Sequence, residues 1–431
     1  MRTLKPTEVF TPTKPPVDEH NIYVHRHQFE KRLRKAFQRA STPVIFGDYG
    51  VGKTSLSLIT LDNLMEGEGQ VIRITDPTGL EISEIYKRAF EQLGYQVTLS
   101  ETSISERTGS AELQASATSN IGAGSFFNIL KVGLVGSGKI ANTEKREKVK
   151  QFIVASPTEG KAIEIFCEAK VVFLVDELHH ASELLKRQIT AAVKSCSDQG
   201  LEYPKFILCG TSSDARAIAE INMGVDRLMT EIKVIPLAEA ESTQIVVDGF
   251  EALGVDFETE LPRQVALVAG GAPSLVHSIA LELAETAISE DRKVDSRDLT
   301  DALNEVIQEG QNERMLAAYN RAINHTGSKR YRKHILTVMA ESDETYVTTG
   351  ELAAGVSAIL DEEVPQSRIS GPLRDLKSEE YGAILVNPLM VDGREQHNQS
   401  CFSQPQMKSY IRFLLKAEHF GADVAGDGAV E

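Results

Sequence analysis

Short apolar runs alternate, along the first half of the chain, with longer segments whose apolar residues recur every three or four positions. The short runs predict buried strands, and the longer segments predict amphipathic helices. The predicted strands are Pro43–Phe46, Val71–Ile74, Val171–Val175, Phe206–Cys209 and Ile232–Ile235. The predicted helices are Lys53–Met65, Glu81–Leu93 and Ser182–Cys196. This alternation predicts an α/β fold, a parallel sheet with helices on both faces, over residues 41–237.

The pattern becomes purely helical after residue 237. Residues 238–325 keep helical periodicity throughout and predict an α-helical lid. Residues 326–420 read as three helices, two strands around an Asp392-Gly393 turn, and a last helix from Gln406 to Ala417. This order predicts a winged helix-turn-helix. Residues 421–431 read as an acidic tail.

Two local signals refine the segment 326–420. Thr348 and Glu351 have the spacing of a capping box and predict the start of the second helix. Gly371-Pro372 is expected to disturb the third, which is the recognition helix of a winged helix. The candidate DNA-contacting residues are Arg368, Arg374 and Lys377 on the third helix, Arg394 on the wing, and Lys329, Arg330, Arg332 and Lys333 on the first.

The sequence GDYGVGKT, from Gly47 to Thr54, follows the first predicted strand and matches the Walker A pattern. Its glycines let backbone N–H groups surround phosphate oxygens, and the next helix points its positive end at the anion. Lys53 is expected to reach the β- and γ-phosphates of ATP, and the Thr54 hydroxyl to bind Mg²⁺. The predicted nucleotide-binding residues are Gly47, Asp48, Tyr49, Gly50, Val51, Gly52, Lys53, Thr54 and Ser55, with Asp176 downstream.

A second acidic motif follows the strongest predicted strand, Val171–Val175. Asp176 and Glu177 come directly after this strand, in a Walker B pattern. Asp176 is expected to hold the Mg²⁺ shell through water or through Thr54. Glu177 is expected to act as the catalytic base that activates the attacking water.

These motifs, in this order, resemble the AAA+ ATPases. Within this class, the chain most resembles the TniB-type transposition helpers, the secretion-type ATPases and the origin initiators. The resemblance rests on four motifs in order: GxxxxGKT, LVDELHH, LCGTS and a final DRL before the last strand. The resemblance covers about residues 22–307. It implies that Thr211 is the sensor 1 residue and that Arg227 is an arginine finger that enters a neighbouring subunit's site. Both are therefore candidate catalytic residues, with Lys53 and Glu177.

One position departs from this resemblance. Ser274 stands where related families often carry a sensor 2 arginine. The Gly271-Ala272-Pro273 sequence is also similar to a motif of the STAND signalling ATPases, so that class remains an alternative.

The remaining segments are less specific. Residues 1–40 predict an extended arm followed by a lead-in helix. In one interpretation Tyr23 or Val24 of this segment contacts the base of the nucleotide. In the other, the helix only precedes the core and contacts no nucleotide. Residues 96–143 are rich in Ser, Thr, Gly and Ala and predict an insertion, either a partner-binding hairpin or a disordered excursion. Within it, 133–139 nearly repeats Walker A, but Ile140 replaces the residue that would bind Mg²⁺.

Composition narrows the class of protein. The net charge of −16 excludes a protein whose whole surface binds nucleic acid, but it allows a local basic face. No apolar run approaches the length of a membrane span, and the scattered cysteines predict reduced thiols, so we expect a cytoplasmic protein. Two functions fit: a nucleotide-controlled oligomeric ATPase that acts on double-stranded DNA or a DNA-acting effector protein, or a STAND-like signalling or defence switch whose winged helix contacts protein.

Overall fold

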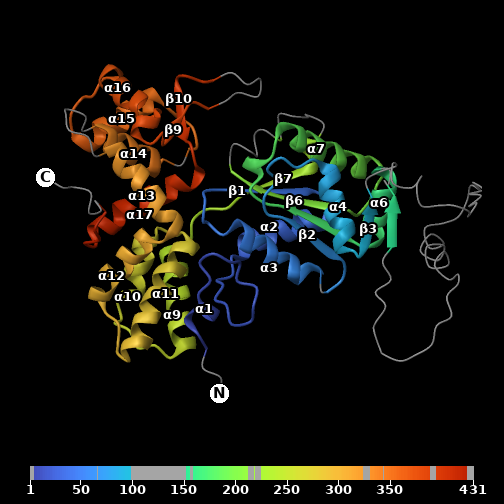
Figure 1. The fold of residues 1–431 in the computed structure, drawn as a ribbon, viewed down its shortest axis with the longest axis horizontal. Helices are drawn as coiled ribbons and strands as arrows, with labels where there is room; N and C mark the ends of the chain where they lie inside the picture. Colours follow the sequence, from blue (N-terminus) through green and yellow to red (C-terminus); the bar gives the residue numbers. More distant parts are fainter. Residues whose placement is uncertain are drawn as a thin grey trace, which may run out of the picture.

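The computed structural model describes residues 4–65, 67–98, 152–155, 159–211, 218, 225–323, 331–342, 344–388 and 395–424. In these residues an α/β lobe lies beside a column of helices, and the N-terminal arm runs between them (Figure 1). Several predicted features lie outside the described residues: most of the insertion 96–143 with its near-repeat, the Asp392-Gly393 turn, Arg394, Lys329, Arg330 and most of the tail.

A five-stranded parallel sheet forms the centre of the α/β lobe, in the order β2-β5-β6-β1-β7. Its strands are β1 (Thr42–Phe46), β2 (Gln70–Ile74), β5 (Val171–Val175), β6 (Lys205–Gly210) and β7 (Met229–Lys233). All five residues of β5 are buried, as its unbroken apolar run predicts. The predicted α/β fold class is therefore confirmed.

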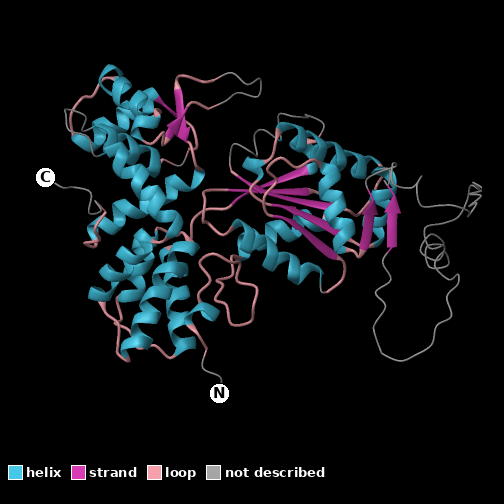
Figure 2. Cartoon of the chain, in the orientation of Figure 1, coloured by secondary structure: helices cyan, strands magenta, loops and turns pink. Residues whose placement is uncertain are grey.

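Helices cover both faces of this sheet (Figure 2). One face packs against α2 (His27–Gln38) and α3 (Lys53–Met65). The other packs against α4 (Ile82–Gln92), α6 (Glu159–Glu168) and α7 (Glu183–Asp198). Val172 and Leu174 belong to the first core and Phe173 to the second, because successive residues of a strand point to opposite faces.

Two details of the sheet differ from the prediction. The last strand starts at Met229 and pairs with β1 from Thr42, which leaves Ile235 beyond the strand with an exposed fraction of 52%. The described residues also include a small parallel pair, β3 (Tyr95–Thr98) and β4 (Phe152–Ala155). Neither strand was predicted, because a four-residue strand gives little periodicity and its partner is distant in sequence.

The helical column begins with the segment predicted as a lid. Its helices are α9 (Glu239–Leu253), α10 (Leu261–Ala269), α11 (Pro273–Glu290), α12 (Ser296–Gln308) and α13 (Gly310–Ile323). Their buried residues form one continuous core with those of the C-terminal helices. Phe10, which follows the short helix α1 (Pro6–Val9), is fully buried in the same core.

The C-terminal segment contains three helices and a small antiparallel sheet, and ends in a further helix. The helices are α14 (Tyr331–Glu341), α15 (Thr349–Leu360), α16 (Gln366–Leu376) and α17 (Pro405–His419). The sheet has the order β8-β10-β9, with strands β8 (Val347–Thr348), β9 (Leu385–Val386) and β10 (Gln399–Phe402). The sequence predicted two of these strands, and β8 adds the third. The predicted capping box is present, because Glu351 accepts hydrogen bonds from both the backbone and the side chain of Thr348.

The expectation that Gly371-Pro372 disturbs the third helix is wrong. Helix α16 continues through Pro372 to Leu376. Ile369, Leu373 and Leu376 are buried on both sides of the proline, so packing holds the helix on the core despite the lost hydrogen bond. None of the helices in the described residues is long and apolar enough to cross a membrane. The four cysteines, all within the described residues, form no disulfide.

Candidate nucleotide-binding site

The Walker A sequence forms a tight loop between β1 and α3. Gly50 and Gly52 have φ angles of 77° and 86°, in the left-handed region that favours glycine. A Cβ on Gly47 would lie 2.2 Å from the Val234 carbonyl oxygen, so only glycine fits there. The Lys53 ammonium donates hydrogen bonds to the carbonyl oxygens of Gly47 (3.1 Å) and Asp48 (2.9 Å). The loop thus has the conformation that its glycines were expected to allow.

Thr54 and Asp176 meet at the carboxyl edge of the sheet. The Thr54 hydroxyl donates a hydrogen bond of 2.6 Å to Asp176 Oδ2. Asp176 has an exposed fraction of 4%, and Arg73 Nη2 of β2 lies 3.8 Å from the same oxygen. A hydroxyl and a carboxylate are the hard oxygen ligands that Mg²⁺ prefers, so this donor set fits the predicted metal.

Glu177 follows in a strained conformation. Its φ and ψ of 48° and 45° are left-handed, which is uncommon for a residue other than glycine and is frequent at functional sites. Its carboxylate is partly exposed, and Oε2 lies 3.3 Å from His179 Nδ1. The Glu177 carboxylate is therefore more accessible to solvent than that of Asp176.

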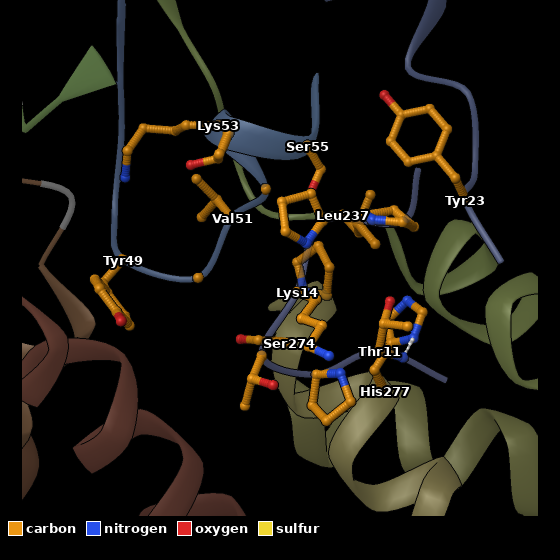
Figure 3. Close-up of a pocket in the computed structure, with 18 of the residues that line it drawn as sticks. Thr11, Lys14, Tyr23, Tyr49, Val51, Lys53, Ser55, Leu237, Ser274 and His277 are labelled. Carbon is orange, nitrogen blue, oxygen red and sulfur yellow. Dashed lines mark hydrogen bonds between the residues drawn. The ribbon is translucent and has the colours of Figure 1, made fainter. Parts of the chain in front are cut away.

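A cavity of about 300 Å³ opens beside these groups. It is lined by the P-loop, Asp176, Glu177, Tyr23 and Val24, and also by residues 11–16 of the N-terminal arm, Leu237, Ser274 and His277. In the view of Figure 3, Tyr23 and His277 lie on one side, Tyr49 and Lys53 on the other, and Lys14 between them. The cavity therefore has one end formed by the P-loop and the acidic pair, and a second end formed by the arm and α11.

The arm is fixed to α11 at this second end. The backbone N–H of Thr11 donates a hydrogen bond of 3.1 Å to His277 Nδ1 (Figure 3). Burial lowers the pKa of His277 to about 4, so the ring is neutral and carries its proton on Nε2. The ring of Phe10 packs edge-on against both Phe250 and His277. The sequence indicated Tyr23 or Val24 as a contact in the site, and both line the cavity. It gave no sign that residues 11–16 do so, since the contacts of Phe10 and Thr11 join residues more than 200 positions apart.

Other groups brace the P-loop from outside. Buried Arg26 donates hydrogen bonds to the carbonyl oxygens of Val51 (3.0 Å) and Ile235 (2.5 Å). Ser274, at the start of α11, comes so close to Gly50 that a Cβ there would lie 2.9 Å from Ser274 Oγ. Tyr49 lines the cavity with Asp176 and Glu177, and burial raises the pKa of its hydroxyl, as do these two carboxylates.

The remaining candidate residues lie at different distances from this cavity. Thr211 is half-buried directly after β6, at the same edge of the sheet. Arg227 is exposed in the short turn Asp226–Leu228 before β7 and does not line the cavity.

The DNA candidates divide into exposed and buried residues. Arg368 and Arg374 are exposed on α16. Lys377 is half-buried and donates hydrogen bonds to Asn387 Oδ1 (2.5 Å) and the Gln399 carbonyl oxygen (3.3 Å), so it braces the small sheet. The expectation for Arg332 is wrong, because its exposed fraction is 1% and its guanidinium lies over the Tyr381 ring at 4.3 Å. A buried guanidinium cannot reach a phosphate.

Solved structures resemble this chain at low identity. No protein-family model and no curated protein sequence matches it. The ORC2 protein of Aeropyrum pernix in its ADP form is 13% identical, with 97% of this chain and 99% of that chain covered and a TM-score of 0.49. Cdc6p of Pyrobaculum aerophilum is 12% identical, with 96% and 98% covered and a TM-score of 0.47. The RuvB Holliday junction branch migration motor of Thermotoga maritima is 13% identical, with 96% and 99% covered and a TM-score of 0.37. These TM-scores are all below 0.5, so none of these similarities bears on the function of this chain.

Proposed function

We propose that this chain binds ATP with Mg²⁺ and hydrolyses it to ADP and phosphate. The observation that supports this most is the hydrogen bond from Thr54 to Asp176, two residues that line the same cavity as the glycine-rich loop. A loop of backbone N–H groups, a lysine and a paired hydroxyl and carboxylate form the donor set that a magnesium nucleotide requires.

Each residue has a role in this proposal. Mg²⁺-ATP supplies the phosphoryl group that water attacks. Lys53 and the P-loop backbone bind the phosphates, Thr54 and Asp176 hold the metal, and Glu177 takes the proton of the attacking water. Thr211, at the end of β6, contacts the γ-phosphate. Tyr23, Val24 and His277 bound the opposite end of the cavity, where the base fits.

The proposal extends to assembly. We assign the chain to the AAA+ type, with an arm over 1–40, a core over 41–237, a lid over 238–325, a winged helix over 326–420 and a tail over 421–431. In this reading the protein is a nucleotide-controlled oligomeric switch. Its exposed Arg227 acts on a neighbouring copy, and its C-terminal segment acts on double-stranded DNA or on a DNA-acting effector protein. The exposure of Arg227, Arg368 and Arg374 supports these roles.

One observation favours the STAND-like alternative. Helix α17, from the C-terminal segment, contacts the P-loop of the same chain. In a signalling switch, such a contact keeps a monomer closed around ADP. Specific activity that rises with protein concentration supports the oligomeric ATPase, whereas tightly held ADP in a monomer supports the switch.

Substitution of Lys53 tests the proposed activity directly. Lys53→Ala removes the charge that faces the phosphates, so ATP binding measured by calorimetry should fall below detection and phosphate release should stop. Lys194→Ala removes an exposed lysine from α7 and should leave both unchanged. If Lys53→Ala binds and hydrolyses ATP like the wild type, the proposed function is wrong.

A further inference from the structure

The last helix of the chain reaches back to the phosphate-binding loop. Helix α17 crosses the middle of the helical column, with one end toward the α/β lobe (Figure 1). There the Ser409 hydroxyl donates a hydrogen bond of 2.9 Å to the Tyr49 carbonyl oxygen, across 360 residues of sequence. The loop that binds phosphate is thus held partly by the C-terminal segment.

Two cations of α17 converge on one carboxylate of this loop. Arg412 Nη1 lies 2.9 Å from Asp48 Oδ2, and Lys408 Nζ lies 3.3 Å from Asp48 Oδ1. The Lys408 side chain is only 9% exposed, and those of Arg412 and Asp48 are 22% and 26% exposed. Partial burial makes such pairs stronger than exposed ones.

The position of Asp48 makes these cations relevant to nucleotide binding. A carboxylate within a phosphate-binding loop repels a polyanionic ligand. The backbone oxygen of Asp48 also accepts a hydrogen bond from the Lys53 ammonium. Asp48 therefore binds the cations of α17 through its side chain and orients Lys53 through its backbone. The two cations therefore neutralise an unfavourable charge and fix the loop segment that holds the key lysine.

The same two cations also bind the last turn of α14 and the segment that follows it. Arg412 donates hydrogen bonds to the carbonyl oxygens of Ala340 and Ser342, and Lys408 donates one to that of Glu344 at 3.4 Å. A shift of α17 relative to α14 would move the charges that face Asp48. The C-terminal segment and the P-loop are therefore connected through these two side chains.

We propose that Lys408 and Arg412 are positioning residues for the nucleotide. They raise nucleotide affinity by neutralising Asp48 and holding its peptide unit under Lys53, so that the placement of the C-terminal segment controls how tightly the P-loop binds phosphate. This inference rests on the proposed nucleotide binding, and it concerns affinity rather than the chemical step.

A mutant cycle on the full chain tests this positioning role. Calorimetry measures the affinity of each variant for ADP and for a non-hydrolysable ATP analogue. Lys408→Met/Arg412→Gln should weaken binding about tenfold, the order expected of one uncompensated unit charge near the phosphates. Asp48→Asn alone should bind more tightly than the wild type, because the loop then loses a carboxylate that repels the phosphates and keeps both cations. Adding Asp48→Asn to Lys408→Met/Arg412→Gln should restore most of the lost affinity, because the charge that needed neutralising is gone.

Glu418→Gln is the matched control. Glu418 pairs with Lys333 at 3.0 Å and also joins α17 to α14, and among the described residues its ion pair is with Lys333 and not with the P-loop. Its substitution should leave affinity unchanged. If Lys408→Met/Arg412→Gln fails to fold, the single Lys408→Met with and without Asp48→Asn repeats the cycle.

The outcomes separate this inference from the proposed function. If the wild type binds nucleotide and Lys53→Ala does not, the proposed function stands. If Asp48→Asn then fails to restore affinity in the charge-deleted variant, or itself weakens binding tenfold, the positioning role is overturned. If the wild type binds neither ligand, the proposed function fails first.

Discussion

The Thr54 hydroxyl donates a 2.6 Å hydrogen bond to Asp176 Oδ2, across 122 residues of sequence. Because both groups are oxygen ligands suited to Mg²⁺, Asp176→Asn should remove the dependence of ATP affinity on the metal. Calorimetry with Mg²⁺ and with a chelator measures this dependence. The variant should bind equally, and weakly, in both conditions. An Asp176→Asn protein that still gains affinity from Mg²⁺ would show that the metal is held elsewhere.

Glu177→Gln should bind ATP with near-normal affinity and hydrolyse it at least about a hundredfold more slowly. The amide keeps the shape of the side chain but cannot accept the proton of the attacking water. Binding by calorimetry and single-turnover phosphate release separate the two effects. Normal turnover by this variant would remove Glu177 from the role of base.

Arg227→Ala should bind ATP nearly normally and lose roughly 10³-fold or more in hydrolysis, if the arginine acts on a neighbouring copy. The side chain is exposed and does not line its own cavity, so its effect requires a second subunit. Mixing Arg227→Ala with Glu177→Gln should recover part of the activity, because one shared site would then have both groups. Absence of any recovery, with activity independent of protein concentration, would indicate a monomeric switch.

Lys14→Ala should weaken ATP-analogue binding several-fold, because Lys14 is a cation of the arm that lines the cavity. Lys5→Ala, on the same arm but outside the cavity lining, is the control and should bind normally. Equal affinities of the two variants would mean that the arm only covers the site.

Arg368→Ala/Arg374→Ala should lower affinity for duplex DNA of any sequence and reduce the log–log salt slope by about two, since each phosphate contact contributes about one. Fluorescence anisotropy of a labelled duplex, with and without an ATP analogue, measures both quantities. The control Arg263→Ala/Arg297→Ala removes two exposed lid arginines and should change neither. A wild type that binds no DNA at low salt, even with the analogue, would leave the C-terminal segment as a protein-contact module.

The sequence alone determined the parts of this protein that depend on contiguous residues. Strand β5, helix α3 and the capping box at Thr348 follow from patterns only a few residues long, and all three lie where they were predicted. The P-loop belongs to the same class, because its glycine spacing sets its backbone directly. The meeting of Thr54 with Asp176 also followed, since the ends of parallel strands share one edge of a sheet.

The tertiary structure decided whatever depends on contacts between distant segments. The sequence did not place Lys14 and His277 in the cavity, nor Arg412 on Asp48, because the last pair is 364 residues apart and no local pattern connects them. It suggested Arg332 as a phosphate contact, but packing buries that side chain over Tyr381. A motif fixes the conformation of its own backbone, whereas burial and charge pairing depend on which surfaces the whole fold brings together.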